Sequence, residues 1–207
     1  MHADHARRWT ADEVRRMLLH ESWSWPRYEL VGGHLLVTPA PGVAHYRAVM
    51  WLFDVLRAYV GRERIAEVML SPADLALLPG TVSQPDLFVP PRSEAEDAAE
   101  WSDIRHLLLA VEVISPGSER NDRGWKRRYY QQANVAEYWI VDLDARLIER
   151  WRPDDDRPEI ADQILTWHPA GAAAQLIVDL TALFAAATPT RRGRNASDDK
   201  PPPPARS

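Results

Sequence analysis

The sequence contains no cysteine. This absence excludes disulfide bonds, thiolate metal sites and a cysteine nucleophile, and it is typical of the reducing cytoplasm, where we expect this chain to work. Long apolar runs are also missing, because the longest, such as residues 107–111, are far shorter than the roughly 20 residues of a membrane-spanning helix. Residues 1–9 carry charges and no apolar segment, so we expect no signal peptide and no membrane contact.

An excess of positive charge is missing as well. The chain has 30 acidic residues against 25 Lys and Arg residues, which gives a net charge of −5. Residues 189–207 hold five basic and two acidic residues, so the rest of the chain is more acidic than the total indicates. An acidic body repels a polyanion, and nucleic-acid binding would therefore require a local basic patch or a divalent cation at the contact.

Apolar residues are abundant enough for one core, since 45% of the chain is hydrophobic and nine residues are Trp. We expect a flexible N-terminus over residues 1–9, one domain over residues 10–188 and a disordered tail over residues 189–207, which includes four consecutive prolines.

Apolar spacing and turn residues predict the elements of this domain. Helices are expected over residues 10–20, 43–60, 122–133 and 179–187, with Thr10 and Glu13 as a capping box, Asp122 as a cap and Asn134 as a left-handed closing residue. Strands are expected over residues 28–31, 34–38, 65–70, 75–78, 85–89, 107–114, 138–142, 147–151 and 164–167, and a solvated loop over residues 90–102. The order indicates an α/β or α+β fold, in which helices cover the faces of a sheet.

Glu112 stands where a charged residue is costly. It lies within residues 107–114, an almost unbroken apolar run of the kind typical of a strand that is covered on both faces. An ionised carboxylate in such a place destabilises the fold unless it is paired or binds a cation. A salt bridge to Lys126 or to an arginine would satisfy Glu112, and so would a metal ion.

Asp86 provides a second carboxylate. It follows Pro85 at the start of the short apolar segment of residues 87–89, and strand alternation places it on the same face as Phe88. A Pro-Asp turn is one explanation of this residue. Together with Glu112, however, two carboxylates from neighbouring strands favour a site for one hard divalent cation, which prefers oxygen ligands.

Lys126 lies one turn into the helix expected from Asp122, so its ammonium group can return to the end of the Glu112 strand. Beside a metal ion it would hold the attacking water and stabilise the charge of a phosphoryl transition state. The alternative is a surface cation in a solvated basic run. That run lies next to Trp and Tyr residues, which suits phosphate contacts with stacking, and its candidate nucleic-acid contacts are Arg120, Arg123, Arg127 and Arg128.

Six short motifs occur in a particular order along the chain. They are Tyr28-Glu29-Leu30-Val31 with Gly32-Gly33, Pro39-Ala40-Pro41 with His45, Gln84-Pro85-Asp86-Leu87, Glu112-Val113-Ile114-Ser115-Pro116, Asp122-Arg123-Gly124-Trp125-Lys126 with Tyr130, and Val135-Ala136-Glu137-Tyr138-Trp139-Ile140-Val141-Asp142. In this order they resemble the Uma family of bacterial restriction endonucleases, a branch of the PD-(D/E)XK nuclease superfamily. The resemblance covers roughly residues 28–183.

The resemblance implies a restriction-endonuclease-like mixed β-sheet flanked by helices. It also implies Mg²⁺, for which Mn²⁺ would substitute, held by Asp86, Glu112 and the main-chain carbonyl of Val113. The reaction would be in-line attack of water on a DNA phosphodiester. In the superfamily a lysine stands two residues after the second acid, where this chain has Ile114, so Lys126 must take over that role, as is typical of this branch.

Two further residues are supporting candidates. Glu29 matches the first acid of the family and is expected to be either a further ligand or supporting group, or a plain surface residue of its strand. His45 lies at the start of a helix that faces the expected cleft, where it would contact phosphate, act as an acid or base, or hydrogen-bond at the helix entry.

Three functions stay open at this point. The preferred one is a metal-dependent endonuclease that hydrolyses DNA, which would favour a homodimer if it cleaves both strands. The alternative is a catalytically inactive nuclease-fold protein for nucleic-acid binding or assembly, which the acidic body and the shifted lysine favour. A two-carboxylate hydrolase of sugars needs a wide groove between its acids, and the buried strand of Glu112 offers little room for one.

Overall fold

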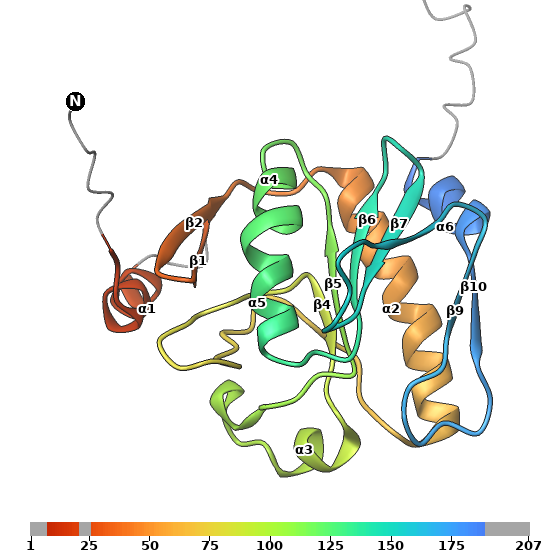
Figure 1. The fold of residues 1–207 in the computed structure, drawn as a ribbon, viewed down its shortest axis with the longest axis horizontal. Coiled ribbons are helices and arrows are strands. Elements are labelled where there is room, and N and C mark those ends of the chain that lie inside the picture. The colour runs from red at the N-terminus through yellow and green to blue at the C-terminus, as the bar shows by residue number, and fades with distance from the viewer. Residues whose placement is uncertain (1–7, 21–25, 189–207) are drawn as a thin grey trace, which may run out of the picture.

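A mixed sheet of six strands lies at the centre of the computed structural model, which describes residues 8–20 and 26–188 (Figure 1). Its strand order is β3-β4-β5-β6-β7-β8. The strands are β3 (Met69–Leu70), β4 (Leu87–Val89), β5 (Leu109–Val113), β6 (Tyr138–Asp142), β7 (Leu147–Trp151) and β8 (Glu159–Ala161). Only β5 and β6 pair in parallel, so the expected mixed sheet is confirmed.

One face of the sheet packs against α2 (Val43–Glu63) and α6 (Leu180–Ala187), with the hairpin of β9 (Ile164–Trp167) and β10 (Leu176–Asp179) beyond them (Figure 1). Strand alternation directs Leu109, Val111 and Val113 of β5 toward this side, where they join the larger apolar core. The Asp179 carboxylate accepts the Ala182 N–H and caps α6.

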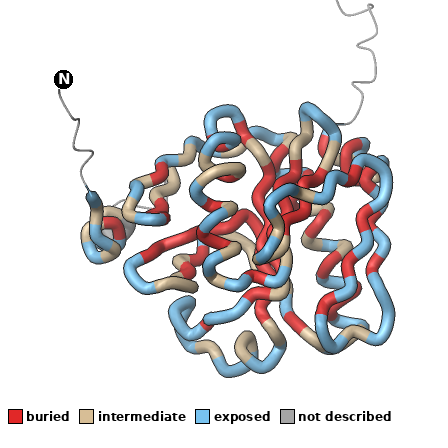
Figure 2. Tube along the Cα trace, viewed as in Figure 1, coloured by how far each residue is buried: buried red, intermediate tan, exposed pale blue. Residues whose placement is uncertain are grey.

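The opposite face packs against a continuous helical segment made of α4 (Glu119–Asn121), a π-helical turn (Asp122–Lys126) and α5 (Arg127–Gln132). Ala110 of β5 contacts the core formed by Tyr129 and Tyr130 on this side. Glu112 is two residues further along β5, so it points to the same side. Strands β4 and β5 are buried along their whole length (Figure 2).

A smaller unit precedes the central sheet, in which α1 (Ala11–His20) lies against the hairpin of β1 (Arg27–Val31) and β2 (His34–Thr38). Gly32 and Gly33 form the two-residue turn with φ angles of +59° and +80°, as predicted. The capping box of α1 is also confirmed, since the Thr10 N–H donates to Glu13 and the Glu13 N–H to Thr10. Leu30 exchanges two main-chain hydrogen bonds with Val82, which attaches the hairpin to the body.

Three predictions between residues 65 and 102 are wrong. The expected strand over residues 65–70 is reduced to β3, and residues 75–78 form only an isolated bridge from Leu75 to Ser83. The expected loop over residues 90–102 contains α3 (Arg92–Asp97) and a 3₁₀ turn (Trp101–Asp103). The Glu94 carboxylate accepts the N–H groups of Arg105 and His106, which explains why this acidic segment is ordered.

Asp122 is not a helix cap. The chain is already helical from Glu119, and Asp122 is buried inside the π-helical turn, where the Arg127 N–H reaches the Asp122 carbonyl five residues back. Asn134 closes the helical segment with a φ angle of +52°, as predicted. Across residues 8–20 and 26–188, no helix combines the length and apolar character needed to cross a membrane. The expected tail and most of the expected flexible N-terminus lie outside the described residues.

Candidate active site

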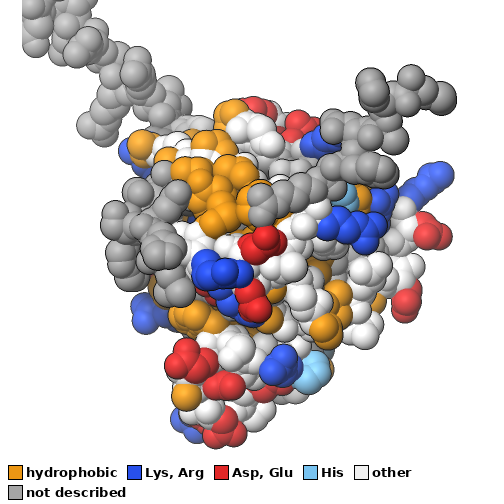
Figure 3. Space-filling view, turned by 90° about the vertical axis from the view of Figure 1, so that its left-hand side faces the viewer, with side chains coloured by type: hydrophobic (Ala, Val, Ile, Leu, Met, Phe, Trp, Pro, Cys, Tyr) orange, Lys and Arg blue, Asp and Glu red, His pale blue; other side chains and the backbone are white. Residues whose placement is uncertain are grey.

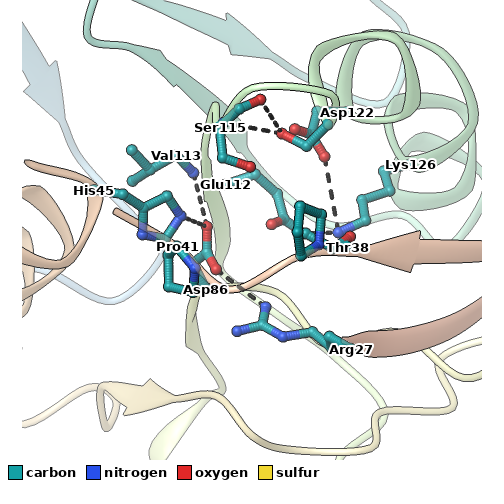
Figure 4. A pocket seen from close by; sticks show the side chains of 12 residues that line it. Arg27, Thr38, Pro41, His45, Asp86, Glu112, Val113, Ser115, Asp122 and Lys126 are labelled. Atoms are coloured by element: carbon teal, nitrogen blue, oxygen red, sulfur yellow. Dashed lines mark hydrogen bonds and ion pairs between the residues drawn. The ribbon is translucent and has the colours of Figure 1, made fainter. Parts of the chain in front are cut away.

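A pocket opens between the end of β5, the helical segment and the loop that joins β2 to α2 (Figure 4). It encloses about 300 Å³, counting the part that is open to solvent. Its charged and polar lining comes from distant parts of the chain, namely Arg27, Thr38, His45, Asp86, Glu112, Ser115, Ser118, Asp122 and Lys126. Pro39 and Pro41 form part of the wall.

The Asp86 carboxylate is held from three sides. Its Oδ1 accepts from Arg27 Nη1 at 3.1 Å, and its Oδ2 contacts His45 Nε2 and accepts the Val113 N–H, both at 2.9 Å. Burial alone would raise the pKa of Asp86, but the hydrogen bond and charge of His45, with the charge of Arg27 and the Val113 N–H, hold it below its ordinary value. Asp86 is therefore ionised, and its orientation is fixed.

The Glu112 carboxylate has the opposite electrostatic environment. Only 3% of the residue is exposed, and its Oε1 accepts from Lys126 Nζ at 2.8 Å and from the Tyr130 hydroxyl at 3.3 Å. Burial raises the pKa of Glu112 well above its ordinary value; Lys126 opposes this shift, whereas the negative charges of Asp86 and Asp122 add to it. Lys126 alone therefore does not offset the cost of burying the ionised Glu112 carboxylate, and further positive charge would stabilise it.

Lys126 lies among three carboxylates. Its Nζ is 2.7 Å from Glu29 Oε2, 2.8 Å from Glu112 Oε1 and 3.8 Å from Asp122 Oδ1. Burial would lower the pKa of Lys126, but attraction to Glu112 and Glu29 raises it above its ordinary value. Lys126 therefore remains an ammonium ion, which donates hydrogen bonds and cannot act as a base at neutral pH.

The buried charges do not balance. Four carboxylates, each at most 7% exposed, meet the two permanent cations Arg27 and Lys126. We call these four the carboxylate cluster: Glu29, Asp86, Glu112 and Asp122. When all four are ionised, their charge exceeds that of Arg27 and Lys126 by two, and a protonated His45 beside Asp86 would reduce this excess to one. A divalent cation would offset the excess.

The donor set also fits a hard cation. Asp86 and Glu112 face the same pocket (Figure 4). Asp86 Oδ1 accepts from Arg27, whereas Oδ2 contacts both His45 and the Val113 N–H, so Oδ1 keeps capacity for a further ligand. In the described part of the chain, no three His, Asp or Glu side chains are placed to hold a metal ion by themselves. An ion bound here would complete its coordination with main-chain oxygen and water, as Mg²⁺ commonly does.

Comparison with known families matches residues 12–182 to the model of a family named Uma2 and described as "Putative restriction endonuclease". The chain belongs to the Uma2 family. Among solved structures, it is similar to the crystal structure of a "putative nuclease belonging to DUF820" from Anabaena variabilis ATCC 29413, with a TM-score of 0.71 and 20% sequence identity. The match covers 87% of this chain and 99% of that one, which shows a shared fold. No curated protein matches. Family membership supports a nuclease function.

The Uma2 fold brings together most of the residues that the sequence singled out. Asp86, Glu112, Val113 and Lys126 line one pocket, and His45 contacts Asp86 directly. Glu29 is not a surface residue: it is fully buried, its Oε1 accepts the Gln84 N–H at 2.8 Å, and its Oε2 contacts Lys126.

The basic run of this Uma2 protein does not form the single patch that its sequence predicts. Lys126 points into the pocket, whereas Arg123 turns toward β6 and β7, where it pairs with Asp142 and Glu149. Arg127 lies over the Trp151 ring at 4.7 Å. Successive residues of a helix leave it in different directions, so closeness in sequence did not give a common surface. Only Arg120 and Arg128 of the four predicted contacts are exposed.

Two charged residues of the pocket were missed. Asp122 was assigned as a cap, although its spacing of four residues from Lys126 could have indicated that both side chains share one side of the helix. Arg27 begins β1, 59 residues before Asp86, and no local signal indicated that its side chain reaches that carboxylate.

Proposed function

We propose that this chain is a Mg²⁺-dependent endonuclease that hydrolyses DNA phosphodiester bonds. The observation that carries the proposal is the carboxylate cluster itself: four buried carboxylates meet two permanent cations, and Asp86, Glu112 and an ammonium group lie in one pocket. Family membership supports the nuclease class, and Mg²⁺ or Mn²⁺ suits the oxygen donors.

The contacts of each residue indicate its role in the proposed reaction. Asp86, Glu112 and the carbonyl of Val113 would hold the cation, which when bound would polarise the phosphoryl group and activate water. His45, Arg27 and the Val113 N–H fix Asp86, and Tyr130 and Lys126 fix Glu112. Lys126, which stays protonated, would donate to the attacking water or to a phosphate oxygen and stabilise negative charge there.

Replacement of Glu112 by Gln tests the proposal. Glu112→Gln keeps the shape of the side chain but removes its charge, so we expect Mg²⁺-dependent cleavage of supercoiled plasmid to fall at least roughly a hundredfold. Glu63→Gln is the matched control, since Glu63 accepts the Ala173 N–H at the far end of α2 and should leave cleavage unchanged. Equal metal-dependent cleavage by wild type and Glu112→Gln would refute the site.

A second function is favoured by one observation. Both oxygens of Asp86 already have protein donors, as in a scaffold that has lost turnover and keeps nucleic-acid binding or assembly. Titration calorimetry with Mg²⁺ and Mn²⁺ separates the two functions, because a scaffold without turnover need not bind metal at this pocket.

An endonuclease that cleaves both strands would favour a two-fold dimer, which sedimentation would detect.

A further inference from the structure

Arg27 has the most exposed charged side chain of the pocket. Its side chain is 13% exposed, compared with 7% for Asp86 and 4% for both Lys126 and Glu112. Arg27 is the first residue of β1, and alternation along β1 places Glu29 on the same side of the strand. Arg27 therefore lies nearer the mouth of the pocket, whereas Glu29 reaches Lys126 in its interior.

The contact of Arg27 involves the same oxygen that a metal ion would use. Arg27 Nη1 donates to Asp86 Oδ1 at 3.1 Å and to the Gln84 carbonyl at 2.9 Å. Asp86 Oδ2 has two donors, so Oδ1 is the atom with capacity for a cation. A cation on Oδ1 would face the positive charge of Arg27 across one carboxylate, and this repulsion weakens cation binding while the pocket holds no substrate.

An anion at the mouth of the pocket would remove that repulsion. A phosphate oxygen lying between the cation and Arg27 is attracted to both, and a guanidinium group binds phosphate through a planar set of donors. Cation and phosphate would then each strengthen the binding of the other, which is a coupling between two ligands.

We propose that Arg27 is a counter-ion of Asp86 that opposes divalent-cation binding in the free protein and becomes a contact for the substrate phosphate when the cation is bound. This inference rests on the proposed function, and it adds a substrate-binding residue that couples the two ligands. Its consequence is that the free protein binds the cation weakly, and that DNA raises the affinity.

Calorimetric titration of the metal-free protein with Mn²⁺, without DNA, tests whether Arg27 opposes cation binding. We expect Arg27→Gln to bind Mn²⁺ about tenfold more tightly than wild type, because the repelling charge is gone. Arg27→Lys keeps the charge and should resemble wild type, and Arg27→Met provides a second neutral variant. Arg92→Gln removes an equal charge from an exposed ion pair outside the pocket and is the control.

Fluorescence anisotropy of a labelled DNA duplex, in saturating Ca²⁺, tests whether Arg27 contacts the substrate phosphate. Arg27→Gln should bind the duplex about fivefold or more weakly than wild type, since a charge-assisted phosphate contact is lost. Unchanged or weaker Mn²⁺ binding by both neutral variants would overturn the inference, and tighter Mn²⁺ binding with unchanged DNA binding would overturn the phosphate contact. Absence of Mn²⁺ binding in every protein, wild type included, would overturn the proposed function as well.

Discussion

At the scale of single residues, Asp122 is the most distant of the three carboxylates around Lys126. Lys126 Nζ is 3.8 Å from Asp122 but within 2.8 Å of Glu29 and Glu112. Burial raises the pKa of Asp122 to about 6 from an ordinary value of 3.8; Lys126 and a hydrogen bond with Ser118 oppose the shift, and Asp86 and Glu29 add to it. Ionised Asp122 therefore destabilises the folded state.

Replacement of Asp122 by Asn should stabilise the metal-free protein. The folded-state pKa of Asp122 lies above the ordinary value, so its favourable contribution is complete below pH 3.8 and is lost as the pH rises through about 6. We expect Asp122→Asn to raise the free energy of unfolding by about 1–3 kcal/mol at pH 8, and by much less at pH 4. Urea denaturation in EDTA at both pH values measures this.

The exposed Asp154 provides the control, because Asp154→Asn should change stability little at either pH. A less stable Asp122→Asn protein at pH 8 would show instead that Lys126 requires the charge of Asp122.

The sequence predicted the site residues whose charge or motif stands out from the neighbouring residues. Glu112 interrupts an apolar strand, and Asp86 and Lys126 occur in motifs at interpretable spacings. Arg27 conflicts with nothing near it in sequence, because its partner Asp86 is 59 residues away. Asp122 had a plausible local explanation as a cap, and only the earlier start of the helix at Glu119 moved it into the interior.

At the scale of elements, a side chain of α5 adds to the main-chain bridges that hold the segment before Asp86. Residues 71–86 contain no strand, and the Tyr129 hydroxyl of α5 hydrogen-bonds with the Leu77 N–H at 3.2 Å, Thr81 Oγ1 at 3.3 Å and Ser83 Oγ at 3.2 Å. Tyr129 is only 3% exposed. One buried hydroxyl thus ties this segment to the helical segment that carries Lys126.

Removal of that hydroxyl should destabilise the fold. Tyr129→Phe leaves buried donors without their acceptor, and we expect the free energy of unfolding to fall by about 1–3 kcal/mol. Guanidinium denaturation measures the change. Tyr46→Phe removes a hydroxyl from a side chain that is 61% exposed, and it should leave stability unchanged. If the two variants unfold at the same midpoint, the Tyr129 hydroxyl does not anchor the segment.

This anchoring explains which elements could be predicted. The helix over residues 43–60 and the strands over residues 107–114 and 138–142 have long periodic or apolar patterns, and each is present. The conformation of residues 71–86 is stabilised in part by Tyr129, a partner more than 40 residues away, so no local sequence pattern predicted it.

At the scale of the whole molecule, the described residues show no broad basic area on the face drawn in Figure 3. The face in Figure 3 carries acidic and basic side chains intermingled, beside an area of hydrophobic side chains. The net charge of the chain is −5, and many arginines, among them Arg123 and Arg150, are paired with carboxylates. Under the proposed function, DNA would therefore be held by a small number of phosphate contacts and by the cation of the pocket.

The salt dependence of DNA binding reports that number. Each neutralised phosphate contributes a slope of about −0.9 to a plot of log affinity against log salt concentration. Arg27 and the two exposed arginines Arg120 and Arg128 are the cations that we propose for separate phosphate contacts, whereas Lys126 is already paired with Glu29 and Glu112. We therefore expect a slope of about −3 in saturating Ca²⁺, and a large loss of affinity when EDTA replaces Ca²⁺. Anisotropy titrations of a labelled duplex at several NaCl concentrations measure both. A slope steeper than about −6 would mean that other cations make most of the phosphate contacts. The basic residues of 189–207 are the first candidates for these cations. The pocket would then select the scissile phosphate without supplying most of the affinity.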